Sequence, residues 1–292
     1  MNILSFDIEE WYLEKEFWGN RASKYKEFDG FLDRILLKLD ERGFKGTFFC
    51  LGGMATEFPE VVKKIDAAGH EVGCHSFKHV WLNTMTEEEL EEDTRKAIDA
   101  LEQCMGKKVV SYRAPAFSVG KENKSAFEIL AKCGIRRDAS IFPANRGLGG
   151  FTEFGEKKPT MVYCNSTRIK EFPICTTKLL GREVAYSGGG FFRFFPLSFV
   201  QKEMGRADYS MTYFHIDDLV PESSRVLTKA EYEMYFKEPG TLKNRCMRYI
   251  KTNLGKKGAF NKLLKLIDTE EFVNLEQADK MIDWEQAPSV IL

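Results

Sequence analysis

The feature that most constrains the fold is an alternation of short apolar segments with longer segments of helical periodicity. The short apolar segments cover residues 2–9, 46–51, 70–75, 109–113, 135–138, 169–174 and 210–215. Apolar residues with helical spacing lie between them, over residues 28–42, 57–68, 86–106 and 121–133. Strands that alternate with helical patterns of this length indicate parallel βα units. The sequence therefore predicts an α/β fold built around a parallel sheet.

The chain changes character after about residue 220. From there it is richer in charged residues, and helical patterns cover residues 229–236 and 258–267. No internal repeat or low-complexity segment marks a linker. We therefore predict a barrel domain over residues 1–220 and a C-terminal extension over residues 221–292 that packs on the barrel.

The composition disfavours several classes of partner. A formal net charge of -1 and a pI near 6.5 argue against binding to nucleic acid or to an anionic membrane surface. The apolar runs are too short to cross a bilayer. Seven cysteines without a C-x-x-C pair, and a first segment without basic residues, predict a cytoplasmic protein with reduced thiols. The sequence gives no indication of the oligomeric state.

Polar residues interrupt the apolar segments, and they mark the expected site. They are Asp7, Glu9, His75, Arg113, Asp138 and His215. In parallel α/β barrels the active site lies at the carboxyl ends of the strands, where these residues are expected. His70 falls at the start of a strand, the opposite end, and is predicted to be structural.

Two acidic residues share one face of the first strand. A period of two places Asp7 beside Glu9 and directs Glu10 to the opposite face. Two carboxylates on an apolar strand are costly unless a positive group binds them, although acidic residues also occur at strand ends that emerge into solvent.

The four histidines of the chain include a closely spaced pair, His75 and His79. If the chain turns helically after the third strand, the two imidazoles lie on one face and share a metal ion. The alternative is a pair of ordinary surface histidines, because this spacing alone is weak evidence.

The polar residues also occur in a familiar order. The motifs are Asp7-Ile8-Glu9, His75-Ser76-x-x-His79, Arg113-x-Pro115, Asp138-x-Ser140 and His215. Their order over residues 1–220 resembles the five motifs of the polysaccharide deacetylase family, carbohydrate esterase family four. The segment Ser187 to Arg193 resembles the branch associated with bacterial exopolysaccharide loci. The resemblance implies a distorted (β/α)7 barrel with a helical C-terminal extension.

The resemblance also implies a divalent metal site. Glu9, His75 and His79 would hold the ion, most simply zinc, with cobalt, nickel or manganese as alternatives. Asp7 would act as the base. The family usually has Asp-Asp in the first motif, so the resemblance leaves open whether Glu9 or Asp7 is the carboxylate ligand.

Further roles follow from the same resemblance. Arg113 would pair with Asp7, and His215 would act as the acid with Asp138 orienting its ring. Ala116 would donate its N–H to the oxyanion, and Phe117 and Arg193 would contact the substrate. The glycine run before Arg193 has a second interpretation as a flexible loop. Tyr213 stands where the family has Leu in the fifth motif.

The function implied by this resemblance is metal-dependent hydrolysis of an N-acetyl group on an amino sugar or polysaccharide precursor. A cytoplasmic amidohydrolase that opens a cyclic imide or ureide is an alternative of similar fold. A non-catalytic sugar-binding protein is a second alternative. Acetate release would distinguish the first function from the other two.

Overall fold

The computed structural model describes residues 1–144, 149–221 and 225–292. Its centre is a sheet in which seven neighbouring strands run parallel. In spatial order they are β12 (Phe214–His215), β2 (Ser5–Ile8), β3 (Thr47–Cys50), β4 (Glu71–Cys74), β5 (Ser111–Tyr112), β6 (Arg137–Asp138) and β8 (Thr167–Glu171). This arrangement confirms the predicted α/β class and corresponds to the distorted (β/α)7 barrel.

Further strands extend this sheet or lie beside it. An antiparallel strand, β7, pairs with β8, and the C-terminal β13 pairs parallel with β7. The other described strands form two short pairs, one parallel and one antiparallel. The bounds are β1 (Asn2–Ile3), β7 (Thr160–Cys164), β9 (Thr176–Leu179), β10 (Arg182–Ala185), β11 (Ser210–Met211) and β13 (Ser289–Ile291).

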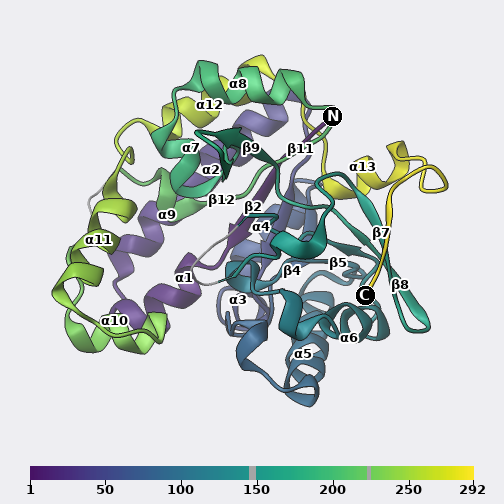
Figure 1. The fold of residues 1–292 in the computed structure, drawn as a ribbon. Coiled ribbons are helices and arrows are strands. Elements are labelled where there is room, and N and C mark those ends of the chain that lie inside the picture. The colour runs from purple at the N-terminus through teal and green to yellow at the C-terminus, as the bar shows by residue number, and fades with distance from the viewer. Residues whose placement is uncertain (145–148, 222–224) are drawn as a thin grey trace.

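Helices surround the strands, with α2, α8 and α12 grouped on one side and α3, α5 and α6 on another (Figure 1). The α-helices are α1 (Glu10–Leu13), α2 (Ala22–Arg42), α3 (Gly52–Glu57), α4 (Pro59–Ala67), α5 (Glu87–Met105), α6 (Ala126–Lys132), α7 (Gly189–Phe194), α8 (Leu197–Arg206), α9 (Ile216–Leu219), α10 (Lys229–Phe236), α11 (Leu242–Asn253), α12 (Ala259–Thr269) and α13 (Leu275–Met281). The π-helix η1 (Glu14–Trp18) follows α1, and the short 3₁₀ helices are η2 (Leu82–Thr84), η3 (Pro115–Phe117), η4 (Lys121–Asn123) and η5 (Thr152–Phe154).

Local sequence signals explain where the long helices begin and end. The Thr86 hydroxyl accepts a hydrogen bond from Glu89 N, and the Glu89 carboxylate accepts one from Thr86 N, which is the capping box at the start of α5. Helix α2 ends at Gly43, whose φ of 67° suits glycine. The apolar stripes of both helices are buried.

The C-terminal residues do more than add helices. Helix α12 packs against α2, α8 and α9. Val273 forms a parallel bridge with Ile3, and β13 joins the main sheet through β7. The extension is mainly helical, as predicted, and it also supplies an edge strand. The proposed division at residue 220 stays a prediction.

His70 lies at the end of the strands opposite the other histidines, at the start of β4. Its Nδ1 accepts a hydrogen bond from Gly46 N at 3.1 Å, and its ring packs on Phe48. Burial and the nearby Lys45 ammonium lower the pKa of His70 to about 4. The neutral ring is thus part of the core.

Two global features complete the description. No helix in the described ranges is long and apolar enough to cross a membrane. All seven cysteines lie in those ranges, and each is a free thiol.

We predict that the low pKa of His70 makes the folded state less stable, relative to the unfolded state, as the pH falls. Its folded pKa of about 4 is below the unfolded value of 6.5, so only the unfolded state gains a proton as the pH falls through 6.5. Between pH 8 and 5.5 the wild type should lose about 1 kcal/mol more stability than His70→Asn, which keeps an acceptor for Gly46. Urea unfolding of both proteins at each pH measures the difference, and equal losses would contradict the prediction.

Candidate metal and catalytic site

Three side chains converge where β2 and β4 end. Glu9 follows β2, His75 follows β4, and His79 lies in the loop after His75. Glu9 Oε2 lies 2.8 Å from His79 Nε2 and 3.3 Å from His75 Nε2. One ligand atom from each residue lies within 4.8 Å of the other two. The structure thus brings together the three residues predicted as metal ligands.

The hydrogen bonds of this cluster show what it can bind. His75 Nδ1 lies 2.7 Å from the carbonyl oxygen of Arg113. Because a carbonyl only accepts, Nδ1 carries the proton, and Nε2 presents its lone pair to Glu9. Within the described residues, the buried Glu9 Oε2 has no hydrogen-bond partner. Lone pairs that face one another in a buried site are stable when a cation lies between them, so these residues fit a divalent metal.

The same arrangement affects the protonation of the carboxylate. Burial acts to raise the pKa of Glu9, but the facing imidazoles of His79 and His75 lower it well below its usual value. Glu9 is therefore ionised at neutral pH and available as a ligand.

The loop that carries the histidines has an unusual backbone. Ser76 and His79 have φ values of 66° and 61°, which residues other than glycine rarely adopt. The start of α3 holds this loop, because Gly52 N and Gly53 N donate to the carbonyl oxygens of Ser76 and Phe77, each at 2.9 Å. A Cβ on Gly52 would lie 2.5 Å from the Phe77 ring. The two glycines therefore permit the close approach that fixes the histidine loop.

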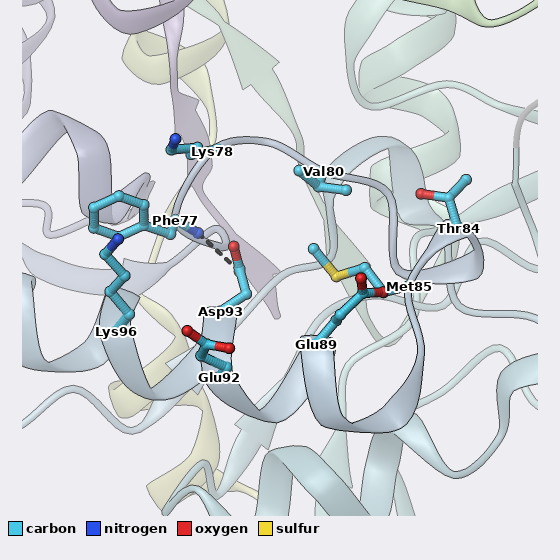
Figure 2. Close-up of a pocket in the computed structure, with 9 residues that line it drawn as sticks. All are labelled: Phe77, Lys78, Val80, Thr84, Met85, Glu89, Glu92, Asp93 and Lys96. Carbon is cyan, nitrogen blue, oxygen red and sulfur yellow. Dashed lines mark hydrogen bonds between the residues drawn. The ribbon is translucent and has the colours of Figure 1, made fainter.

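A cavity of about 330 Å³ lies on the outer side of the same loop, and none of the three candidate ligands lines it. Figure 2 shows Asp93 accepting a hydrogen bond from Phe77 N, at 2.9 Å, and Lys96 beside the Phe77 ring. These contacts brace the histidine loop from α5. The cavity is thus beside the metal cluster and separate from it.

A buried ion pair lies next to the cluster. Arg113 Nη1 is 2.8 Å from Asp7 Oδ1, and neither side chain is more than 3% exposed. Arg113 Nε donates to the Ala139 carbonyl at 3.2 Å, and its guanidinium lies over the Phe49 ring at 4.3 Å. The arginine therefore holds Asp7 in one orientation.

His215, at the end of β12, completes the site. Its Nε2 lies 3.6 Å from Asp7 Oδ2 and 3.8 Å from Glu9 Oε1. Its Nδ1 lies 3.2 Å from Asp218 Oδ2, on the short helix α9 that follows. Burial lowers the pKa of His215, but the hydrogen bond to Asp218 and the nearby carboxylates raise it to about 10. The ring thus faces the site with Nε2.

Asp138 does not orient His215, contrary to the sequence prediction. Its Oδ1 accepts from Ser140 Oγ at 2.7 Å, and it hydrogen-bonds Glu171 on β8. Burial raises the pKa of Asp138. The pKa of Glu171 is raised well above its usual value, both by burial and by the neighbouring carboxyl of Asp138. The two carboxyls are thus a buried, proton-sharing pair. Asp218 was missed, although a spacing of three residues on a helix brings it beside His215.

The side chain of Glu10 lies beside the site, whereas the sequence predicts that it points away. Strand β2 ends at Ile8, and α1 begins at Glu10, so the alternation of faces stops at Glu9. Glu10 is buried, and its Oε1 accepts a hydrogen bond from Asp217 N at 3.0 Å. Burial and the neighbouring Glu9 raise its pKa to about 8.

The turn after Arg113 is strained. Ala116 and Phe117 have φ values of 53° and 54°, a conformation that side chains rarely adopt outside functional sites and tight turns. Among the described hydrogen bonds, none uses the N–H of Ala116, and its role as a donor to an oxyanion stays a prediction. The Phe117 ring is 4% exposed and packs on Phe142 and Tyr213. Its side chain is therefore part of the core rather than a substrate contact.

Arg193 is also engaged elsewhere. The glycine run expected to form a loop instead begins α7, and a Cβ on Gly188 would lie 2.0 Å from Tyr213 O. The buried Arg193 donates to the carbonyl oxygens of Lys251, at 2.9 Å, and Thr252. Its Nε lies 3.3 Å from Asp218 Oδ1. The prediction of a substrate-binding cation is replaced by a bridge between α9 and the end of α11.

Comparison with known families agrees with this geometry. A polysaccharide deacetylase model matches residues 24–137. Residues 24–137 therefore form a polysaccharide deacetylase domain. A second model, a domain of unknown function, matches residues 139–280. The resemblance found in the five motifs is thereby confirmed, while the exopolysaccharide-locus branch stays a prediction.

Two relatives each match less than half of the chain. A peptidoglycan-N-acetylglucosamine deacetylase of Bacillus cereus is 35% identical over 92 residues, which are 30% of this chain and 34% of the relative. A chitooligosaccharide deacetylase of Azorhizobium caulinodans is 31% identical over 123 residues, 40% of this chain and 57% of the relative. The chain thus spans less than two thirds of either relative.

A solved structure resembles the whole chain. A Mycobacterium smegmatis protein, provisionally named a polysaccharide deacetylase, aligns with a TM-score of 0.65 at 17% identity. The alignment covers 100% of this chain and 92% of that one. At this identity the likeness establishes the fold alone.

We predict that His79→Ala weakens zinc binding by about a hundredfold or more, because one of three ligand atoms is removed. Competition with a chromophoric chelator measures the affinity. His70→Asn is the matched control, since His70 lies at the opposite end of the strands. Unchanged zinc affinity in His79→Ala would place the metal elsewhere.

Proposed function

We propose that the protein is a metal-dependent hydrolase that removes the N-acetyl group from an amino sugar of a polysaccharide or its precursor. The observation that carries this proposal is the pair of imidazole Nε2 atoms directed at one unpartnered oxygen of Glu9. Asp7 and His215 adjoin that cluster, as an acid–base pair for hydrolysis requires.

Glu9, His75 and His79 would hold a divalent ion, with zinc the first choice and cobalt, nickel or manganese as alternatives. When bound, the ion would polarise the acetyl carbonyl and increase the acidity of water. Glu9 is the proposed carboxylate ligand rather than Asp7, because Asp7 is paired with Arg113 and Glu9 Oε2 contacts both imidazoles.

Asp7 accepts a proton from the water that attacks the acetyl carbon. The ion pair with Arg113 fixes the orientation of the Asp7 carboxylate. As the carbonyl carbon becomes tetrahedral, the N–H of Ala116 donates a hydrogen bond to the developing oxyanion.

His215 then donates the proton on Nε2 to the departing nitrogen. The carbon–nitrogen bond breaks, and the products are acetate and a free amine. Asp218 accepts the Nδ1–H and thereby directs Nε2 toward the site. In these steps one proton moves from water to Asp7, and another moves from His215 to the departing nitrogen.

The relatives named above support this chemistry, since their names describe deacetylation of peptidoglycan and chitooligosaccharide. A Bacillus subtilis relative, 29% identical over 111 residues, is a peptidoglycan-N-acetylmuramic acid deacetylase. All of these substrates are N-acetylated sugars, which is the class proposed here. A cytoplasmic location remains part of the proposal and rests on the seven free cysteines.

We predict chelator-sensitive acetate release from N-acetylglucosamine oligomers by the metal-loaded protein. Asp7→Asn should reduce the rate at least about a hundredfold, because the proton acceptor is lost while the three ligands remain. Acetate is measured by an enzyme-coupled assay, and metal content by emission spectrometry. No acetate from free, nucleotide-linked or oligomeric N-acetyl sugars would overturn the proposed function, and turnover of imides or ureides would favour the cyclic-amide alternative.

We also predict different consequences for the two aspartates considered as partners of His215. Asp218→Asn should lower kcat by roughly tenfold or more with unchanged metal content, because the Nδ1–H loses its carboxylate. Asp138→Asn should act on stability, since Asp138 contacts the buried Glu171 instead. Kinetics and urea unfolding of both variants test this, and a kcat effect confined to Asp138→Asn would reverse the assignment.

A further inference from the structure

The C-terminal part of the chain brings an aromatic ring to the metal cluster. Tyr235, on α10, stacks over His79 with the ring centroids 6.5 Å apart and the planes 13° from parallel. Figure 1 shows α10 close to α1, which follows Glu9 directly. No motif of the first 220 residues supplies this ring, and the family model that covers it has no assigned function.

Neighbouring rings fix the position of Tyr235. Its ring centroid lies 5.3 Å from that of Trp18 and 5.4 Å from that of Phe17, both on η1. Phe236 packs against it from the same helix at 4.8 Å. Tyr235, Trp18 and Phe17 are each only partly buried, so the cluster keeps an accessible surface next to His79. We call these three residues the aromatic wall.

The hydroxyl of Tyr235 has a different environment from its ring. In the described ranges, no hydrogen bond to this hydroxyl is present. A tyrosine hydroxyl can donate one hydrogen bond and can also accept hydrogen bonds. A protonated hydroxyl near a metal ligand, without an acceptor of its own, is available to donate to a bound molecule.

Contacts outside the wall anchor this part of the chain to the site. Arg193 joins the carbonyl oxygens at the end of α11 to Asp218 on α9. Lys256, only 2% exposed, forms an ion pair with Asp217 at 2.8 Å. Both contacts reach α9, the helix that begins directly after His215. The segment that carries Tyr235 is therefore tied to the helix that orients the proposed acid.

We propose that Tyr235 is a substrate-positioning residue contributed by the C-terminal part of the chain. Its hydroxyl donates a hydrogen bond to an oxygen of the bound amino sugar, and the aromatic wall covers the apolar face of the sugar ring. Binding sites of this kind combine aromatic surfaces with a few well-placed polar groups. This inference rests on the proposed function and assigns part of its substrate site.

Two substrates separate positioning from a structural role. The first is an N-acetylglucosamine tetramer, and the second is 4-nitrophenyl acetate, which carries an acetyl group without a sugar. Tyr235→Phe should reduce kcat/KM for the tetramer about fivefold, mainly through KM, as expected for one hydrogen bond between neutral groups. Tyr235→Ala should reduce it further because the ring is also lost. Both variants should keep the wild-type metal content and the wild-type rate on 4-nitrophenyl acetate.

Tyr249→Phe is the matched control, because Tyr249 is 37% exposed on α11 and outside the aromatic wall. It should leave both substrates unaffected. Equal losses on both substrates in Tyr235→Phe, or no loss on either, would overturn the proposal.

The inference and the proposed function can fail separately. If the wild type releases no acetate from any N-acetyl sugar, the proposed function fails, and intrinsic tryptophan fluorescence with the same tetramer tests the sugar site alone. Tetramer binding that weakens in Tyr235→Ala and stays unchanged in Tyr249→Phe would support the site. No binding to the wild type, or equal binding to all variants, would overturn it.

Discussion

The buried guanidinium of Arg113 connects most parts of the site. The guanidinium pairs with Asp7, and the backbone carbonyl of Arg113 fixes the tautomer of His75. The Nε of Arg113 binds the carbonyl of Ala139, so strands β2, β4 and β6 are joined through one residue. A charge buried in this way is stable only with its partners in place, and loss of one partner typically costs several kcal/mol. The positions of Asp7 and His75 therefore both depend on Arg113.

The strands of the parallel sheet were predictable because they are short, apolar and separated by helices with clear periodicity. Strands β7 and β13 were not, since they are the last two strands at one end of the sheet, where half-exposed residues such as Tyr163 obscure the pattern. Helix α7 begins in a glycine run that favours a loop by propensity. Tertiary contacts decide the outcome there, because the Gly188 backbone packs directly against Tyr213.

The candidate site shows a similar division. Spacing and strand ends indicated Glu9, His75, His79 and Arg113, because these follow from local geometry. The partner of His215 was assigned by resemblance to Asp138, whereas a residue one helical turn away makes the contact. Tyr235 carried no local signal, since its contacts with His79 and Trp18 join segments far apart in the sequence. Periodicity predicts which face a residue occupies, and it cannot predict which distant segment that face meets.

The position of β2 has a consequence for biosynthesis. In the folded sheet this strand lies between β12 and β3, yet β12 is made from residues more than 200 positions later in the chain. While the chain is synthesised, β2 is therefore an edge strand with an apolar face and unpaired backbone groups, which are features that promote aggregation. The carboxylate of Asp7 lies on this strand and β12 pairs beside it. The buried charge that pairs with Arg113 in the folded protein thus also discourages wrong pairing of the nascent strand.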